Sequence, residues 1–257
     1  MAWSKFPYSD DAYTYTAASL KKAWARLHAG DAEPFPKDAA LSDAWIAFHA
    51  GEFEKAVKLG LAQGMAGYAV ANKATAIYAN YLEKSEKKKL ALFEEVAARC
   101  EEQQKEQPKN AAGWYWHAYA LGRYAQGISI VKALSQGIGN KVKHSLDMTI
   151  KLAPKHADAH IGLGTYHAEI IDKVGAMIGG LTYGAKKDEG IKLFKAALKL
   201  NPDSAIARIE YANGLVMLEG KKKMDEAIAL YEEAAACEPM DAMERLDVEL
   251  AREELED

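Results

Sequence analysis

The sequence is short of several residue types, and each shortage excludes a class of protein. Two cysteines in 257 residues, Cys100 and Cys237, are too few and too far apart for a disulfide framework or a thiol metal site. No apolar run reaches the roughly 18 residues of a membrane-spanning helix. The formal net charge of -4 lacks the basic excess of nucleic-acid-binding proteins, so no nucleic acid partner is expected.

A secretory signal is also missing from the N-terminal residues, which have no basic start followed by an apolar core. We therefore expect a cytoplasmic protein. A chain from which an export signal had been removed would read the same.

Prolines are few, seven in all, but three of them are regularly placed. Pro154, Pro202 and Pro239 each stand three residues before a segment with helical periodicity. Proline cannot continue a helix, so each is expected to end one helical hairpin and to turn the chain into the next. The sequence therefore predicts an all-α protein built from repeated hairpins.

The segment from Ala157 to Pro202 carries the pattern of one repeat. The tetratricopeptide (TPR) signature is W-x2-L-G-x2-Y, then A-x3-F, then P. This segment reads His160-x2-Leu163-Gly164-x2-His167, then Gly190-x3-Phe194, then Pro202. The neighbouring segments repeat the plan as Trp114-x2-His117-Ala118-x2-Leu121 and as Arg208-x2-Tyr211-Ala212-x2-Leu215. Small residues at Gly164 and Gly190 would let two helices approach closely, with Leu163 and Phe194 filling the seam.

We expect one TPR-like solenoid domain over residues 1–257. Its expected parts are an N-terminal helix or half-repeat (1–36), two hairpins (37–110), three TPR units (111–156, 157–204 and 205–241) and a capping helix (242–257). The half-repeat is suggested by the phrase Trp24–Glu33, which recurs as Trp45–Glu54 at an interval too short for a full hairpin. Its helix is expected to begin at Ser9 or Asp10 and to end near Ala29.

Two central repeats carry inserts between their helices, at 126–139 and 173–184. Both inserts are apolar and punctuated by glycine, and Ile130/Leu134 and Met177/Leu181 have helical spacing. We expect the inserts to lengthen the hairpins, to bury their apolar side chains, to contact each other and to close one side of the solenoid. The alternative is an exposed patch used for self-association or for a membrane surface.

These inserted repeats carry a more specific resemblance. The runs 113–122, 139–144, 150–154 and 159–164 resemble the "regulator of microtubule dynamics" TPR domain, and are similar to the bacterial TPR component associated with tripartite ATP-independent periplasmic (TRAP) transporters. The likeness covers roughly residues 65–240. It implies an all-helical domain without known catalysis that acts through partners or a bound ligand. The membrane-targeting segments of eukaryotic members and the export signal of transporter-associated members are absent from this sequence.

Histidines are the residues that most suggest chemistry. His156 and His160 are spaced i, i+4 and His167 follows two turns later, a pattern that could hold zinc. However, His160 and His167 occupy the Trp and Tyr positions of the repeat, which favours a structural role. Gly179-x4-Gly184-Ala185-Lys186 falls short of a P-loop, which also needs a preceding strand. We therefore expect no catalytic residue, no metal site and no cofactor, and the protein is not expected to be an enzyme.

The partner-binding surface follows from the TPR resemblance, in which the first helix of each hairpin lines a concave face. Carried onto this chain, the lining positions include Trp45, Phe48, Tyr115, Tyr119, Arg123, Asp158, Ile161, Thr165, Ile209 and Asn213. Alternatively, additional helices fill the groove and leave Tyr115 and Tyr119 in the core. We expect a non-catalytic scaffold that binds a protein or peptide partner, and self-association stays open. The alternative is a small-ligand carrier or transporter-accessory protein with an enclosed cavity.

Overall fold

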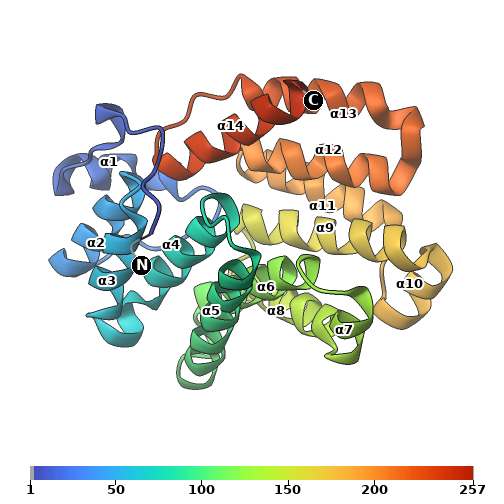
Figure 1. The fold of residues 1–257 in the computed structure, drawn as a ribbon, viewed down its shortest axis with the longest axis horizontal. Helices are drawn as coiled ribbons and strands as arrows, with labels where there is room; N and C mark the ends of the chain where they lie inside the picture. The colour runs from blue at the N-terminus through green and yellow to red at the C-terminus, as the bar shows by residue number, and fades with distance from the viewer. Residues whose placement is uncertain (1–2, 257) are drawn as a thin grey trace. The chain divides into compact units, whose positions relative to one another are not determined.

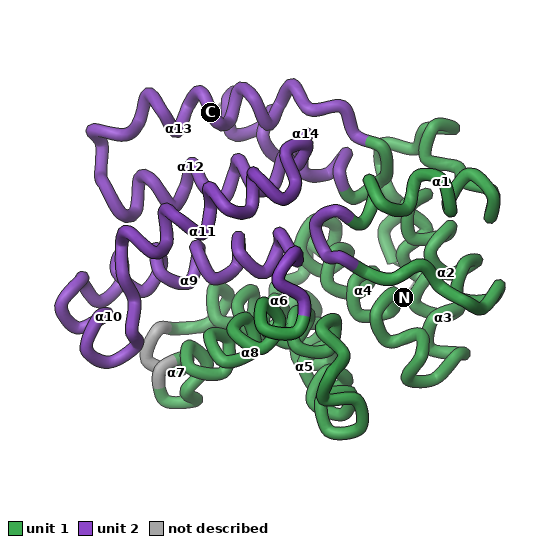
Figure 2. The backbone as a smooth tube through the Cα atoms, turned by 180° about the vertical axis from the view of Figure 1, so that it is seen from behind, with its two compact units in different colours: residues 1–28, 33–152, 240–243 green, residues 29–32, 153–239, 244–257 purple. Residues whose placement is uncertain are grey.

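The structure is a computed structural model and describes residues 3–256, except for the side chains of Ile130, Val131 and Leu134. All regular structure in this described part is helical (Figure 1). The helices gather into two compact units (Figure 2), and each is described by itself. Unit 1 comprises residues 1–28, 33–152 and 240–243, and unit 2 comprises residues 29–32, 153–239 and 244–257.

Unit 1 is a series of hairpins in which α2 packs on α3, α4 on α5 and α6 on α8. Its helices are α1 (Ala17–Leu27), α2 (Ala39–His49), α3 (Phe53–Leu61), α4 (Tyr68–Tyr81), α5 (Glu86–Glu106), α6 (Ala111–Gln126), α7 (Ile130–Ser135) and α8 (Ile138–Leu152). Helix α4 lies at the centre of the unit, and every residue from Ala69 to Ala79 is buried. An interior helix of this kind needs small side chains, which the five alanines of that stretch supply.

The first helix begins later than its sequence predicts. Asp10 caps only a short 3-10 turn, Asp11–Tyr13, after which Thr14 is extended. Helix α1 starts at Ala17, because Thr16 and Ser19 form a capping box in which each side chain bonds the other residue's backbone N–H. The predicted start at Ser9 or Asp10 was therefore wrong, since the stronger reciprocal cap lies one turn and a half downstream.

Unit 2 contains two stacked hairpins, α9 with α11 and α12 with α13 (Figure 1). The first helices α9 and α12 also pack together. Its helices are α9 (Ala157–Val174), α10 (Ala176–Tyr183), α11 (Lys187–Leu200), α12 (Ala205–Glu219), α13 (Met224–Ala235) and most of α14 (Ala242–Glu256). Helices α9, α12 and α14 each begin three residues after a proline, as the spacing of the prolines predicts. Val248 and Ala251 of α14 cover an apolar cluster that includes Ala205, Ile209 and Ala234.

The centre of unit 2 is the fully buried ring of Phe194. A Cβ built on Gly164 of α9 would lie 3.0 Å from this ring, and one on Gly214 of α12 only 2.4 Å away. Two glycines thus let two helices close on one phenylalanine, and the ring of Tyr211 stacks on it at 5.4 Å between centroids. The predicted roles of Gly164 and Phe194 in the seam are confirmed.

The second insert forms the short helix α10, and its apolar side chains are not buried. Met177 is 77% exposed, Ile178 55% and Leu181 85%. The expectation that the insert buries these side chains was wrong, because the chain turns back at Gly175 (φ 81°) and Gly184 (φ 65°) after only two helical turns. In the first insert Ile138 is buried, whereas the side chains of Ile130, Val131 and Leu134 lie outside the described residues. The two inserts belong to different units, so the expected contact between them stays a prediction.

Candidate partner-binding surface

The first helices of unit 2 present one continuous line of partly exposed residues. On α9 and α12 these residues recur at intervals of three and four, which places them on one side of each helix. They are Asp158, Gly162, Thr165, Glu169, Ile206, Glu210, Asn213 and Met217. We call these eight residues the α9–α12 face.

Hydrogen bonds hold the polar side chains of this face in place. Thr165 Oγ1 donates to Glu210 Oε2 at 3.0 Å and so joins α9 to α12. The hydroxyl of Tyr231, on α13, donates to Asn213 Oδ1 at 2.8 Å. Burial raises the pKa of Tyr231, so this hydroxyl stays a donor at neutral pH. The face is therefore ordered before any partner arrives, which lowers the entropy cost of binding.

The charge of this face is of one sign. Asp158, Glu169 and Glu210 are acidic, and none of the eight residues is basic. Lys173, one turn beyond the end of the face, lies 3.7 Å from Glu169. A partner that covers the face would need to bring positive charge or hydrogen-bond donors, because carboxylates are costly to bury alone.

One end of the face is covered by the protein itself. The Asp158 N–H donates to the Gly30 carbonyl oxygen at 3.0 Å, and Gly30 belongs to the loop 29–32 of the same unit. A Cβ on Gly30 would lie 2.5 Å from an Asp158 carboxylate oxygen, so a larger residue there would require the Asp158 side chain to shift. The part of the face open to a partner consequently runs from Gly162 and Ile206 to the far ends of the two helices.

Unit 1 places three of the aromatic residues suggested by the repeat spacing in its core. Trp45, Phe48 and Tyr115 are all buried. The rings of Trp45 and Phe48 meet edge to face at 5.6 Å, and the Lys73 ammonium lies over both. A partner could not touch these side chains without unpacking the unit. Of the two residues that a filled groove would leave in the core, Tyr115 is buried and Tyr119 is half-buried.

The C-terminal half of α6 is the accessible part of the expected surface in unit 1. Tyr119 and Arg123 are half-buried, and the Arg123 guanidinium lies 5.4 Å from the centre of the Tyr119 ring. Arg123 Nη1 also donates to Gln126 Oε1 at 3.2 Å. A Cβ at Gly122 would meet no atom within 4 Å, so the surface between these side chains is open.

The remaining expected positions divide in the same way. Ile161 and Ile209 are buried in the two apolar clusters of unit 2, whereas Thr165 and Asn213 are accessible and lie on the α9–α12 face. Sequence reasoning missed Glu210 and Met217. Helical periodicity could have identified them, because Glu210 lies one turn after Ile206 and Met217 one turn after Asn213.

A buried polar and aromatic cluster is the most unusual feature of unit 1. The two copies of the phrase Trp-x3-His, Trp24/His28 and Trp45/His49, pack together, with His28 stacked on Trp24 at 3.8 Å and edge to face with Trp45 at 4.7 Å. His49 Nδ1 lies 2.7 Å from Asp241 Oδ2, and both side chains are fully buried. The His49–Asp241 pair has the composition of part of a catalytic site. Because both side chains are fully buried, we interpret the pair as structural, since it fastens the segment 240–243 to α2.

The histidines of unit 2 also have structural contacts. His156 caps α9 by accepting from the Ala159 N–H at 3.2 Å, and His160 Nδ1 lies 2.9 Å from the His156 carbonyl oxygen. His167 Nδ1 accepts from the Lys186 N–H at 3.1 Å and so fastens the chain after α10. Within the described residues, no group of three or more His, Cys, Asp or Glu side chains is arranged to hold a metal ion.

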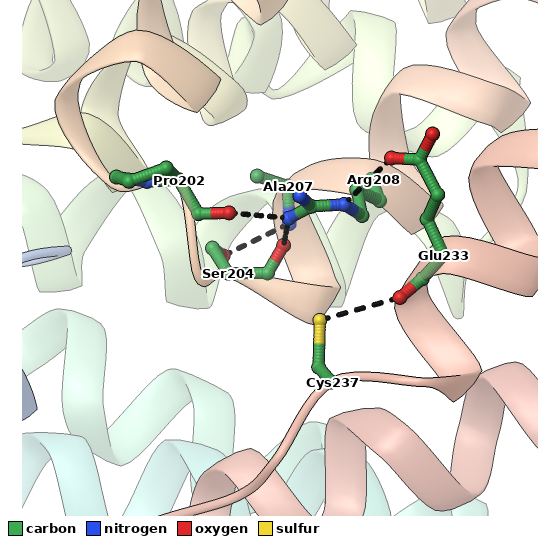
Figure 3. A network of polar contacts seen from close by, with 6 residues as sticks. All are labelled: Pro202, Ser204, Ala207, Arg208, Glu233 and Cys237. Carbon is green, nitrogen blue, oxygen red and sulfur yellow. Dashed lines mark hydrogen bonds and ion pairs between the residues drawn. The ribbon is translucent and has the colours of Figure 1, made fainter.

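An arginine replaces the signature tryptophan of the last repeat and closes its hairpin (Figure 3). Arg208 Nη1 donates to the carbonyl oxygens of Pro202 and Ser204 at 2.8 and 3.0 Å. Arg208 Nε donates to Glu233 Oε2 at 3.1 Å, near the end of α13. The Cys237 thiol donates to the Glu233 carbonyl oxygen at 3.4 Å. This network holds the start of α12 against the end of α13, at the opposite side of α12 from Glu210.

Comparison with known proteins supports the repeat architecture and no more. No protein-family model matches the chain, and no curated protein matches it significantly. Among solved structures, the chain is similar to a thermophilic TPR protein of Thermus thermophilus, with a TM-score of 0.57 and 18% sequence identity. The match covers 83% of this chain and 97% of that one. The fold is thus an all-α helical-repeat solenoid of the TPR kind.

Proposed function

We propose that this protein is a non-catalytic scaffold that binds a segment of a protein partner along the exposed sides of its first helices. The α9–α12 face carries the proposal. It is continuous over two adjacent helices, and hydrogen bonds already join Thr165 to Glu210 and Asn213 to Tyr231 of α13. It also lies where helical-repeat proteins present their binding positions.

The partner segment is expected to be basic. Glu169 and Glu210 flank Thr165 on the face, and complementary charge on a partner would give both attraction and orientation. Met217 at the end of the face is partly exposed and offers one apolar contact beside the carboxylates. A helical partner segment with an apolar residue one turn from a Lys or Arg fits these positions. An extended segment fits them if the two residues are two positions apart.

Two further observations agree with a binding role. On α6, Tyr119 and Arg123 are residue types enriched at interface hot spots, and they offer a second, cationic surface. The resemblance of residues 65–240 to the regulator of microtubule dynamics and TRAP-associated TPR families rests on the sequence alone, since no family model matches the chain. Membership of such a family would imply action through partners rather than catalysis.

Affinity capture from the source cell with three immobilised proteins tests the proposal. The wild type should retain a partner whose binding weakens as salt is raised. Glu169→Gln/Glu210→Gln should lose that partner, since the two substitutions remove the negative charge and keep the shape. Glu253→Gln/Glu254→Gln, at two exposed acids on α14, is the matched control and should retain it.

Equal retention by all three proteins would rule out the α9–α12 face as the binding site. The second surface is tested in the same way with Tyr119→Ala/Arg123→Ala, because Tyr115→Ala would disturb the core instead. Native mass spectrometry of the purified protein tests the alternative that it is a small-ligand carrier, which predicts a copurified small molecule.

A further inference from the structure

The helix α10 presents an apolar surface that packs against nothing in its own unit. Met177, Ile178 and Leu181 are between 55% and 85% exposed, and Met177 and Leu181 stand one helical turn apart. The twelve residues 174–185 contain no charged side chain. Soluble proteins rarely leave side chains of this size so exposed at one tip without a use for them. We call Met177, Ile178 and Leu181 the α10 tip.

The tip is held in place by specific contacts on its inner side. The Tyr166 hydroxyl donates to the Tyr183 carbonyl oxygen at 3.1 Å, and the Ala185 N–H donates to the Gly179 carbonyl oxygen at 3.0 Å. Gly179 is the buried residue of α10, and a Cβ there would lie 3.2 Å from Ile170 of α9. Together with the His167–Lys186 bond, these contacts fix α10 on α9 and leave the three side chains of the α10 tip exposed. A loosely attached loop would not need this anchoring.

The size of the tip decides between a second protein and a lipid bilayer. Side chains of this kind bury at most about 120 Å² each, from the ratio of transfer free energy to area. Three of them fall well short of the ~800 Å² that each partner buries in a stable protein interface. A bilayer needs no matching surface, and the strength of weak, reversible docking to it scales with the apolar area that is buried.

The charges beside the tip point to a particular kind of bilayer contact. Lys173 and Lys186 flank the uncharged stretch, and both are exposed. Their long side chains can place the ammonium groups among lipid headgroups. Asp172 and Asp188 lie beside them and offset their charge. The attraction should therefore come from the apolar side chains, with little dependence on anionic lipid or on salt.

We infer that α10 is a membrane-docking element, and that Met177, Ile178 and Leu181 insert into the interface of a phospholipid bilayer. This inference is independent of the partner proposed for the α9–α12 face. It assigns the second insert a use that the repeat architecture does not require.

Flotation of the full chain with phosphatidylcholine vesicles, with and without phosphatidylglycerol, tests the inference. The wild type should float with both kinds of vesicle. Met177→Ser/Leu181→Ser should lower the partition coefficient by about a hundredfold, at about tenfold for each apolar side chain. Met224→Ser/Ile228→Ser on α13 is the matched control, because these two residues are also apolar, exposed and one turn apart. It should partition within about twofold of the wild type.

A second measurement reports insertion directly. Leu181→Cys, labelled with an environment-sensitive fluorophore in a Cys237→Ser background, should shift its emission to the blue on phosphatidylcholine vesicles, whereas labelled Ile228→Cys should not. The remaining thiol, Cys100, is buried. Because every substituted tip side chain is exposed, circular dichroism should show unchanged helix content.

Three outcomes would overturn the inference. The wild type could fail to float with either vesicle, or the α13 control could lose as much binding as the tip variant. Binding could instead require phosphatidylglycerol and vanish in high salt, which would assign it to surface lysines. Light scattering interprets the first of these outcomes. If the wild type does not bind vesicles and is a dimer, and the tip variant is a monomer, the tip binds a second copy of the chain.

Discussion

Several buried or half-buried polar residues stabilise the structure through partners that the repeat pattern does not indicate. The repeated Trp-x3-His phrase is visible in the sequence, but its use is not, because the residue that completes it, Asp241, lies 192 positions beyond His49. Periodicity along one helix can indicate which side faces inward, but not which distant carboxylate meets it. The same limit applies to Arg208, whose partners are backbone carbonyls and Glu233.

Removal of the Asp241 carboxylate should destabilise the protein strongly. Asp241→Ala would leave His49 without this buried partner, and losses of this kind cost about 2–4 kcal/mol. Urea denaturation followed by circular dichroism measures the change. Glu253→Ala on the exposed side of α14 should change the free energy of unfolding by less than about 0.5 kcal/mol. Similar values for the two variants would contradict a clamping role for Asp241.

His117 should make stability fall in mild acid. Burial lowers the pKa of His117 from its ordinary 6.5, and Glu101, 3.6 Å from Nε2, opposes this only in part. The unfolded chain therefore takes up a proton at this histidine before the native protein does, so stability is lost as the pH falls below about 6.5.

Urea denaturation at about pH 7 and about pH 5 tests the contribution of His117. His117→Gln, which stays neutral and can still bond Ser145, should lose less stability between these pH values than the wild type does. Parallel losses in the two proteins would show that His117 does not contribute.

At the scale of elements, most helices can be predicted from the sequence, since turn residues mark their ends. Prolines precede α9, α12 and α14, and the TPR spacing predicts that Phe194 packs against Gly164. Two elements could not be predicted. The start of α1 depends on a choice between two capping residues, Asp10 and Thr16, and the direction of α10 depends on positive φ angles at Gly175 and Gly184.

Two helical glycines should respond in opposite ways to the same substitution. Gly214→Ala pushes a Cβ into the Phe194 ring, and overpacking of this kind costs about 1–3 kcal/mol against a gain of about 1 in helix propensity. Gly122→Ala on α6 meets open space and should stabilise the protein by about 0.5–1 kcal/mol. Thermal unfolding of both variants measures the difference. A stabilising Gly214→Ala would show that Phe194 has room to move.

At the scale of the whole molecule, the repeat architecture can be predicted but the accessibility of its first helices cannot. The spacing correctly selects first-helix positions on α2, α6, α9 and α12 without indicating how many neighbours cover each one. In unit 1, Trp45, Phe48 and Tyr115 are buried and Tyr119 is accessible. In unit 2, Ile161 and Ile209 are buried and Thr165 and Asn213 are accessible. Among the described residues, no helix is both long and apolar enough to cross a bilayer.

Site-specific photo-crosslinking in the source cell tests the proposed binding face most directly. A photoreactive residue at Met217, on the α9–α12 face, is compared with one at Ile228, on the second helix α13, because both side chains are apolar and similarly exposed. Binding along the first helices predicts a covalent adduct with a partner protein from Met217 and none from Ile228, and the Met217 adduct should disappear in Glu169→Gln/Glu210→Gln. An adduct of equal yield from Ile228, or none from Met217, would contradict the proposal.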